Sequence, residues 1–246
     1  MSIQRVIKAL RDMKADQHDF MPALEAQVDN GKRLGIEQTV PMLASNGIGS
    51  IVAGTDTTGM TLALGIWSIY QDEDIRTRLH TDLQAIWRTE NDHPSLQDLE
   101  GLPYLRACVN ESLRFCSPIS GRLPRITQPG GLDYAGHHIP AGTTISSAVY
   151  LQHFDEEVFT APFTFKPERW LAKDISRQEQ SLVPFSTGSR ACLGSNLATA
   201  EIYIGLATMV RWFKASKVLD KELHTVIHFT RAVPGGLKVD LVEAEQ

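Results

Sequence analysis

The sequence predicts a mainly α-helical chain with small β-sheets, an α+β class, on three observations. A long apolar stretch covers residues 39–70, charged segments with helical spacing follow to residue 116, and β-rich runs with turns appear beyond Pro118. Of the 246 residues, 42% are hydrophobic and 22% charged, which is typical of a globular chain that can bury a core.

The first segments predict helices. Near the amino terminus, apolar residues recur at helical spacing among charges, which indicates an amphipathic helix and not a signal peptide: Ile3, Val6, Leu10 and Met13. Residues 39–70 fit either a membrane span or a long helix covered on all sides by protein. Asp56 and the recurring glycines favour the covered helix, because an ionisable group is costly in lipid.

The later segments alternate between helix and strand. Residues 72–87 predict a surface helix and residues 102–116 a second, amphipathic one, with a break at 91–95. Strands are expected over 132–136 and 143–151, around the turn at 140–142, and again in the tail around its Pro-Gly-Gly turn. Residues 154–190 are expected to be irregular, and a helix from about Ser195 to Lys214 follows.

Charge and cysteine content narrow the classes of function. The formal charge is −5, from 24 basic and 29 acidic residues, which argues against a nucleic-acid partner because phosphate binding needs a basic surface. Cys108, Cys116 and Cys192 form no C-x-x-C pair and no disulfide framework, so a reducing, intracellular compartment is expected.

The segment PFSTGSRACLGSNLA, residues 184–198, carries the clearest chemistry. Gly188 and Gly194 bracket Cys192, and an apolar helix begins directly afterwards. The amino end of that helix favours a thiolate, and the glycines let the backbone approach a flat cofactor closely. Arg190 offers a planar cation for a carboxylate. A buried free cysteine is the common alternative, but the full F-x-x-G-x-R-x-C-x-G pattern from Phe185 to Gly194 argues against it.

This pattern resembles the heme-binding loop of the cytochrome P-450 family. The resemblance implies heme b (iron protoporphyrin IX) as cofactor, with the Cys192 thiolate as axial ligand to the iron. It also implies the carboxyl-terminal half of that family's fold, with a long central helix and the cysteine loop. The amino-acid sequence of residues 121–125 and 130–143 is most similar to that of filamentous-fungal microsomal members, which serve mainly secondary metabolism and detoxification.

Two further motifs stand in the order that the family shows. Glu111-Ser112-Leu113-Arg114 resembles its E-x-x-R motif, and Arg169 lies in Pro167-Glu168-Arg169-Trp170. Taken alone, Glu111 and Arg114 would be an ordinary surface ion pair. The resemblance instead implies that Glu111, Arg114 and Arg169 form a buried charge cluster behind the heme, with a role in folding and heme retention.

The long apolar helix carries the segment Ala53-Gly54-Thr55-Asp56-Thr57-Thr58. Mid-helix threonines commonly bond to a preceding carbonyl, and that is the structural alternative. The resemblance implies a place over the distal face of the heme, where the small Ala53-Gly54 pair leaves room for oxygen. Thr57 would hydrogen-bond dioxygen and Asp56 would help relay protons.

The remaining candidates carry less information. Arg125 resembles the strand arginine that meets a heme propionate, with a solvated arginine as the alternative. His153 and the pair His137-His138 have no ligand spacing and are expected to be structural or on the surface. Cys108 and Cys116 are expected to be ordinary helix residues.

The resemblance covers residues 19–246 and the second half of the family's fold. The chain is therefore expected to be a single partial domain, residues 1–246, without the amino-terminal half or the membrane anchor of eukaryotic members. The substrate pocket would retain the helix near Ala53, residues 118–123 and the turn at Val233-Pro234. A fragment of this kind should expose a large apolar patch.

Two hypotheses follow. The first is a heme-dependent monooxygenase that inserts one oxygen atom into a small lipophilic substrate, with electrons from an NADPH-dependent flavin reductase. Endoplasmic-reticulum association is expected for the full-length family, with no membrane span in this chain. The second is a non-catalytic heme-binding or interaction remnant, and a membrane protein built on residues 39–70 is a distant third.

Overall fold

A computed structural model describes residues 29, 31–33, 35, 40–218, 226–227, 231–232 and 239–243. The chain divides into two compact units, Met1–Asp56 and Thr57–Gln246, and the second contains most of the described structure. The predicted helix over residues 3–13 and the pocket turn at Val233-Pro234 lie outside the described residues.

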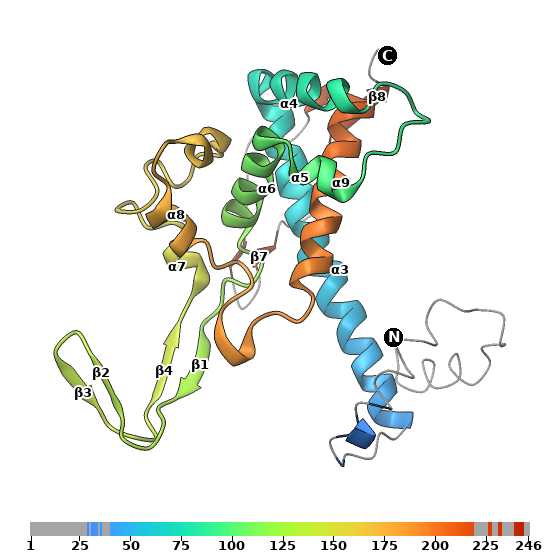
Figure 1. Cartoon of the computed structure of the whole chain (residues 1–246). Helices are drawn as coiled ribbons and strands as arrows, with labels where there is room; N and C mark the ends of the chain where they lie inside the picture. Colours follow the sequence, from blue (N-terminus) through green and yellow to red (C-terminus); the bar gives the residue numbers. More distant parts are fainter. Residues whose placement is uncertain are drawn as a thin grey trace. The chain divides into compact units, whose positions relative to one another are not determined.

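The long apolar stretch forms one helix, α3, Val40–Gln71, as the sequence predicts (Figure 1). Its second half is buried in the second unit, with Leu64 and Ile69 almost fully enclosed. The expectation that it is covered on all sides is wrong for its first half, where Ile51 and Val52 are exposed. Among the described residues, no helix combines the length and the apolarity that crossing a membrane requires.

Four more helices complete the core of the second unit. They are α4 Glu73–Ile86, α5 Leu96–Glu100, α6 Pro103–Cys116 and α9 Ser195–Trp212. Local signals set where they begin: the Asp72 carboxylate accepts from two backbone N–H groups of α4, Ser95 and Asp98 form a capping box, and Pro103 starts α6. Their apolar side chains share one cluster that includes Leu79, Leu83, Leu105, Val109, Ile202 and Leu206.

Helix α6 is amphipathic in its first half, as predicted, and buried throughout its second half. From Glu111 to Cys116 every side chain is buried, including the charged Glu111 and Arg114. The sequence shows charges on this helix and therefore predicts an exposed face. Arg106 is exposed in this way, whereas Glu111 and Arg114 are covered by residues that supply their partners.

Two glycines allow helices to approach closely. A Cβ at Gly65 of α3 would lie 2.5 Å from Ser112 Oγ on α6, and one at Gly205 of α9 would lie 2.6 Å from Leu62 Cδ2 on α3. Both distances are shorter than a van der Waals contact, so a side chain at either position would force the helices or their neighbours apart.

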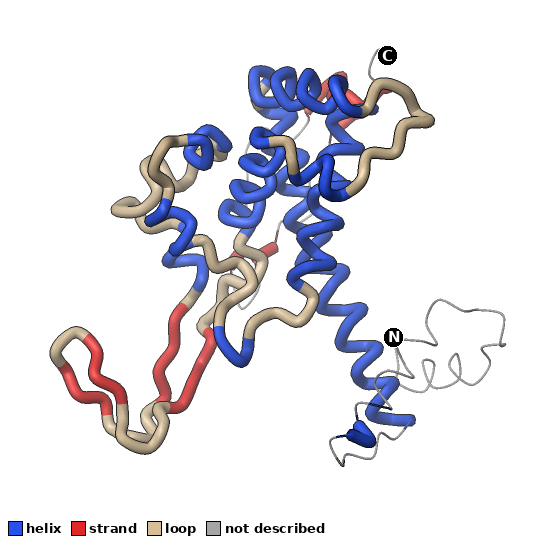
Figure 2. The backbone as a smooth tube through the Cα atoms, viewed as in Figure 1, coloured by secondary structure: helices blue, strands red, loops and turns tan. Residues whose placement is uncertain are grey.

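The strands form small antiparallel pairs (Figure 2). Strand β1, Leu123–Ile126, pairs with β4, Thr144–Ser147, and β2, Leu132–Tyr134, pairs with β3, His137–Ile139. In the tail, β5, Phe213–Val218, pairs with β8, Val239–Glu243, and β6, Val226–Ile227, with β7, Arg231–Ala232. The fold is therefore mainly α with small sheets, as predicted.

The predicted strand over 143–151 is too long. It ends at Ser147, and Val149–His153 forms the short helix α7. Tertiary contacts outweigh the β-preference of this segment. The helical turn stacks Tyr150 on Phe154, with ring centroids 4.4 Å apart, and buries His153 completely. The stretch expected to be irregular contains three short helices, η1 Pro167–Leu171, α8 Ser176–Ser181 and η2 Gly188–Arg190.

Candidate functional site

The cysteine loop is closed by its own backbone. The Cys192 N–H donates to the Phe185 carbonyl at 2.8 Å, and the Ala191 N–H donates to the Gly188 carbonyl at 3.1 Å. Gly188 has φ +75°, a conformation that favours glycine. Phe185 is partly buried against the core cluster. The loop is thus held both by internal hydrogen bonds and by packing on the helices below it.

Cys192 is exposed and precedes the first residue of α9 by three positions. The cap residue Gly194 supplies no side-chain hydrogen bond, so the first N–H groups of the helix keep their preference for a negative partner. Leu193, the next residue, is fully exposed, and Leu197 in the first turn of α9 is 66% exposed. A Cβ added at Gly188 or at Gly194 would meet open space.

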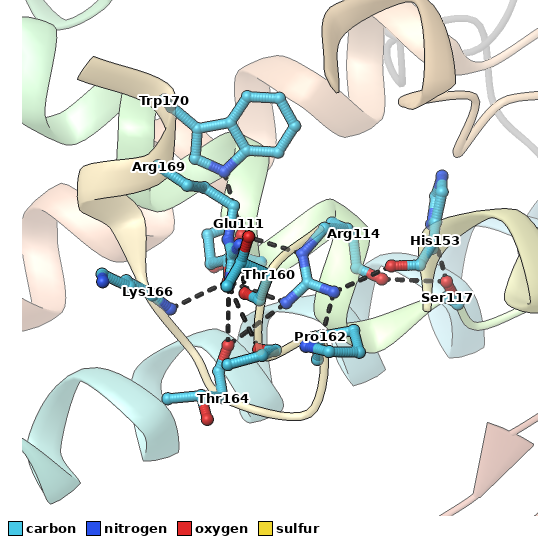
Figure 3. Close-up of polar contacts among 12 residues, drawn as sticks. Glu111, Arg114, Ser117, His153, Thr160, Pro162, Thr164, Lys166, Arg169 and Trp170 are labelled. Carbon is cyan, nitrogen blue, oxygen red and sulfur yellow. Dashed lines mark hydrogen bonds and ion pairs between the residues drawn. The ribbon is translucent and has the colours of Figure 1, made fainter. Parts of the chain in front are cut away.

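A second feature is a buried charge cluster centred on Glu111 (Figure 3). Its Oε1 accepts from Arg114 Nη2 at 2.8 Å, the Lys166 N–H at 2.8 Å and Arg169 Nε at 3.2 Å. Its Oε2 accepts from Arg114 Nε and Trp170 Nε1, each at 2.9 Å. Five donors therefore saturate one carboxylate that water does not reach.

The two arginines organise the chain that follows α7. Arg114 Nη1 donates to the carbonyls of His153 and Pro162, at 2.9 and 2.8 Å. Arg169 donates to the carbonyls of Thr160, Ala161 and Thr164. Burial lowers the pKa of Arg169, and the Glu111 carboxylate opposes that change. One carboxylate and two guanidinium groups thus hold a segment that has little regular structure of its own.

The structure adds members to the charge cluster that the sequence does not predict. Trp170 and the Lys166 backbone complete the cluster, and Tyr104 Oη donates to Glu168 Oε1 at 2.6 Å beside it. Trp170 directly follows Arg169 in the sequence, so its membership in the cluster could have been predicted from that position. His153 is buried against Ser117 and Val183, and no spacing in the sequence indicates that contact.

The candidate distal residues lie on α3. Ala53, Gly54 and Asp56 are exposed and belong to the first unit, while Thr57 is partly buried and belongs to the second. No neighbouring atom lies where a Cβ at Gly54 would project. Thr61 Oγ1 donates to the Thr57 carbonyl at 3.0 Å, which is the back-bonding that mid-helix threonines commonly make.

Arg125 lies on β1 opposite Ile145 and is exposed. Its Nη1 donates to the carbonyl of Pro124 at 2.9 Å. His138 pairs with Asp133 on the exposed β2–β3 hairpin, at 2.7 Å. Cys108 and Cys116 are buried in α6, and burial raises the pKa of the Cys108 thiol. Of the three cysteines, Cys192 alone is exposed.

The residues around Cys192 fit a heme. The site offers one exposed sulfur, which suits a metal whose remaining ligands come from a macrocycle. Within the described ranges, no group of three or more His, Cys, Asp or Glu side chains is arranged to enclose a metal ion by itself. Exposed Leu193 and Leu197 suit an apolar ring face, and the exposed Arg190 suits an anionic substituent at its edge.

Comparison with known proteins identifies the family of the chain. The model of the cytochrome P-450 family matches residues 2–233. The chain is 43% identical over 166 residues to cytochrome P-450 monooxygenase macH of Penicillium terrestre, covering 66% of this chain and 32% of that protein. It is 38% identical over 189 residues to monooxygenase pbrB of Penicillium brasilianum, covering 76% and 36%. Monooxygenase penB of Penicillium thymicola is 36% identical over 203 residues, covering 82% and 46%.

The chain therefore spans about a third of the length of the first two relatives. The family match nevertheless extends over most of its residues, and it includes the cysteine loop and the segments that build the charge cluster. On this evidence the chain belongs to the cytochrome P-450 family.

Proposed function

We propose that the protein acts as a heme-dependent monooxygenase, which inserts one atom of dioxygen into a small, lipophilic organic substrate. The observation that carries this proposal is the exposed Cys192 thiol, held in a hydrogen-bonded loop at the amino end of α9. The relatives' names as monooxygenases support it. An NADPH-dependent flavin reductase as electron donor and an endoplasmic-reticulum location belong to the same proposal.

Cys192 would hold heme b through its thiolate, and Phe185 would support the loop by packing against the core cluster. Gly188 and Gly194 would let the backbone approach the ring, because neither position presents a side chain. The exposed guanidinium groups of Arg190 and Arg125 would bind the propionates. When bound, a thiolate-ligated heme supplies the reductive activation of dioxygen and the cleavage of its O–O bond.

The polar residues of α3 would manage protons. Asp56 would take up a proton at its carboxylate from solvent, to which it is exposed, and pass it toward the Thr57 hydroxyl. Ala53 and Gly54 would keep the neighbouring turn of the helix free of bulky side chains. The cluster of Glu111, Arg114 and Arg169 would act in folding and heme retention, since its polar atoms are satisfied within the protein.

The absorption spectrum of the reduced, carbon-monoxide-treated chain tests the site. We expect residues 1–246, expressed with a supply of heme, to give the strongly red-shifted Soret band of thiolate ligation. Cys192→Ala should abolish the band, while Cys108→Ala, which removes a buried thiol, should keep it. A histidine-type band, or no bound heme, would contradict the proposal.

A second outcome separates catalysis from binding alone. Leu193 and Leu197 expose apolar surface that equally suits a protein that only binds heme. With the red-shifted band present, a reductase and NADPH should support oxygen consumption coupled to substrate oxidation. Binding without turnover would favour the non-catalytic alternative.

A further inference from the structure

His153 uses both of its ring nitrogens in the interior. The side chain lies at the end of α7 and is fully buried. Its Nδ1 lies 2.7 Å from Ser117 Oγ, and its Nε2 lies 3.1 Å from the backbone nitrogen of Val183. Ser117 ends α6, whereas Val183 leads into the cysteine loop, so one imidazole joins two segments that are 66 positions apart in the sequence.

The partners determine which tautomer is present. A backbone N–H is only a donor, so Nε2 must present its lone pair to Val183. The ring proton therefore sits on Nδ1 and is donated to Ser117 Oγ. The Ser117 hydroxyl in turn donates to the Arg114 carbonyl at 2.9 Å. All three hydrogen bonds run in one direction, from the Val183 amide to the end of α6.

The same contact reaches both the charge cluster and the cysteine loop. The His153 carbonyl accepts from Arg114 Nη1, so backbone and ring are both anchored at α6. On the other side, the Val183 carbonyl accepts from the Ser186 N–H at 3.0 Å, and Phe185 between them accepts from the Cys192 N–H. Val183 is thus held on its N–H side by His153 and on its carbonyl side by the turn that opens the loop.

We propose that His153 is a positioning residue for the cysteine loop: its neutral imidazole holds the Val183 amide and, through the turn at 183–186, the place of the Cys192 sulfur. This inference rests on the proposed role of Cys192 as the heme ligand. Burial, and then the Arg114 guanidinium, lower the pKa of His153 to about 4, which keeps the ring neutral near pH 7.

Two substitutions separate the two ends of the imidazole. The amide of His153→Gln reaches the position of Nε2 and offers an oxygen to the Val183 N–H. The amide of His153→Asn reaches only the position of Nδ1, so it retains the bond to Ser117 and loses Val183. Both replacements are uncharged primary amides, and the pair therefore differs by one methylene group and by which partner is kept.

Hydrogen exchange of the Val183 amide, followed by NMR in the heme-free chain, measures this contact directly. In His153→Asn we expect exchange to accelerate on the order of tenfold relative to His153→Gln, as loss of one neutral hydrogen bond implies. The Leu206 amide in the core is the reference, because a merely destabilised fold would accelerate both amides. Equal Val183 rates in the two variants, after this correction, would overturn the proposal.

A second measurement needs no variant. The ¹⁵N shifts of the His153 ring in the unmodified chain should report a proton on Nδ1 and none on Nε2. The opposite tautomer would contradict the assignment. With heme bound, His153→Asn should lose a larger share of the red-shifted carbon-monoxide band than His153→Gln. The heme-free measurements still read out if no such band forms, so a failure of the proposed function is distinguishable from a failure of this inference.

Discussion

At the scale of single residues, Glu111 shows how a charge is kept inside this protein. Its two oxygens accept five hydrogen bonds, two of them from one arginine in the bidentate geometry that carboxylates and guanidinium groups favour. Burying an ion pair is costly in itself, and removal of one partner leaves an uncompensated charge. The residue is therefore more important to stability than its ion pair alone suggests.

Glu111→Gln should lower the free energy of unfolding by about 3–5 kcal/mol, because Arg114 and Arg169 would remain buried without their counter-charge. Chemical denaturation of the two proteins measures this. Glu73→Gln is the matched control: Glu73 also pairs with an arginine three residues later, Arg76, but it is mostly exposed. That change should cost less than about 1 kcal/mol. Similar costs at the two sites would show that burial is not the cause.

His153 predicts how stability depends on pH. Its pKa in the folded protein, about 4, lies below its ordinary value of 6.5, so the unfolded chain takes up a proton first as the pH falls. The contribution of neutral His153 to the free energy of unfolding is complete above pH 6.5, declines between pH 6.5 and about 4, and does not change further at lower pH. Converted to free energy, the difference in pKa corresponds to about 3 kcal/mol.

Denaturation midpoints of the unmodified chain and of His153→Gln, measured from pH 7 to pH 4, test this dependence. As the pH falls, the free energy of unfolding of the unmodified chain should decrease more steeply than that of His153→Gln, since glutamine does not titrate. The difference in slope should correspond to the uptake of at most one proton. Arg114, the charged group that faces the ring, is present in both proteins and cancels from the comparison. Parallel curves would contradict the prediction.

At the scale of helices and strands, the sequence predicts best where the signal is local. The places of α3, α4, α6 and α9 follow from apolar spacing, and two of their starts from the N-cap Asp72 and from Pro103 at the first helical position of α6. The wrong end of the strand over 143–151 has a different origin. The contacts that bury His153 at the end of Val149–His153 come from Ser117 and Val183, which no window around the segment contains.

The close approach of α3 to α6 gives a prediction at this scale. Gly65→Ala should destabilise the protein by about 1–2 kcal/mol, because an overpacked contact with Ser112 outweighs the better helix propensity of alanine. Gly59→Ala, on the same helix, meets open space and should stabilise by up to about 1 kcal/mol. Thermal unfolding of both variants is the measurement. Changes in stability of the same sign in the two variants would refute this account.

At the scale of the whole molecule, the sequence and the structure inform different parts of the candidate site. The pattern from Phe185 to Gly194 predicts the loop and the place of its cysteine, because the spacing of its glycines, arginine and cysteine is itself specific. The charge cluster was expected as a triad. Trp170, Lys166 and the carbonyls of residues 160–164 complete it. They do so because the segment 160–170 folds back onto α6, and the spacing of residues in the sequence does not predict that fold.

The hydrogen bond from the Cys192 N–H to the Phe185 carbonyl has a consequence for how tightly the loop would bind a ligand. Each residue that is ordered on binding costs about 1–2 kcal/mol in conformational entropy. Here the backbone of the loop is already hydrogen-bonded and Phe185 is already packed, so that cost has been met during folding. A ligand would bind a preorganised receptor, and mutations that loosen the loop should weaken its capture even when every contacting atom remains.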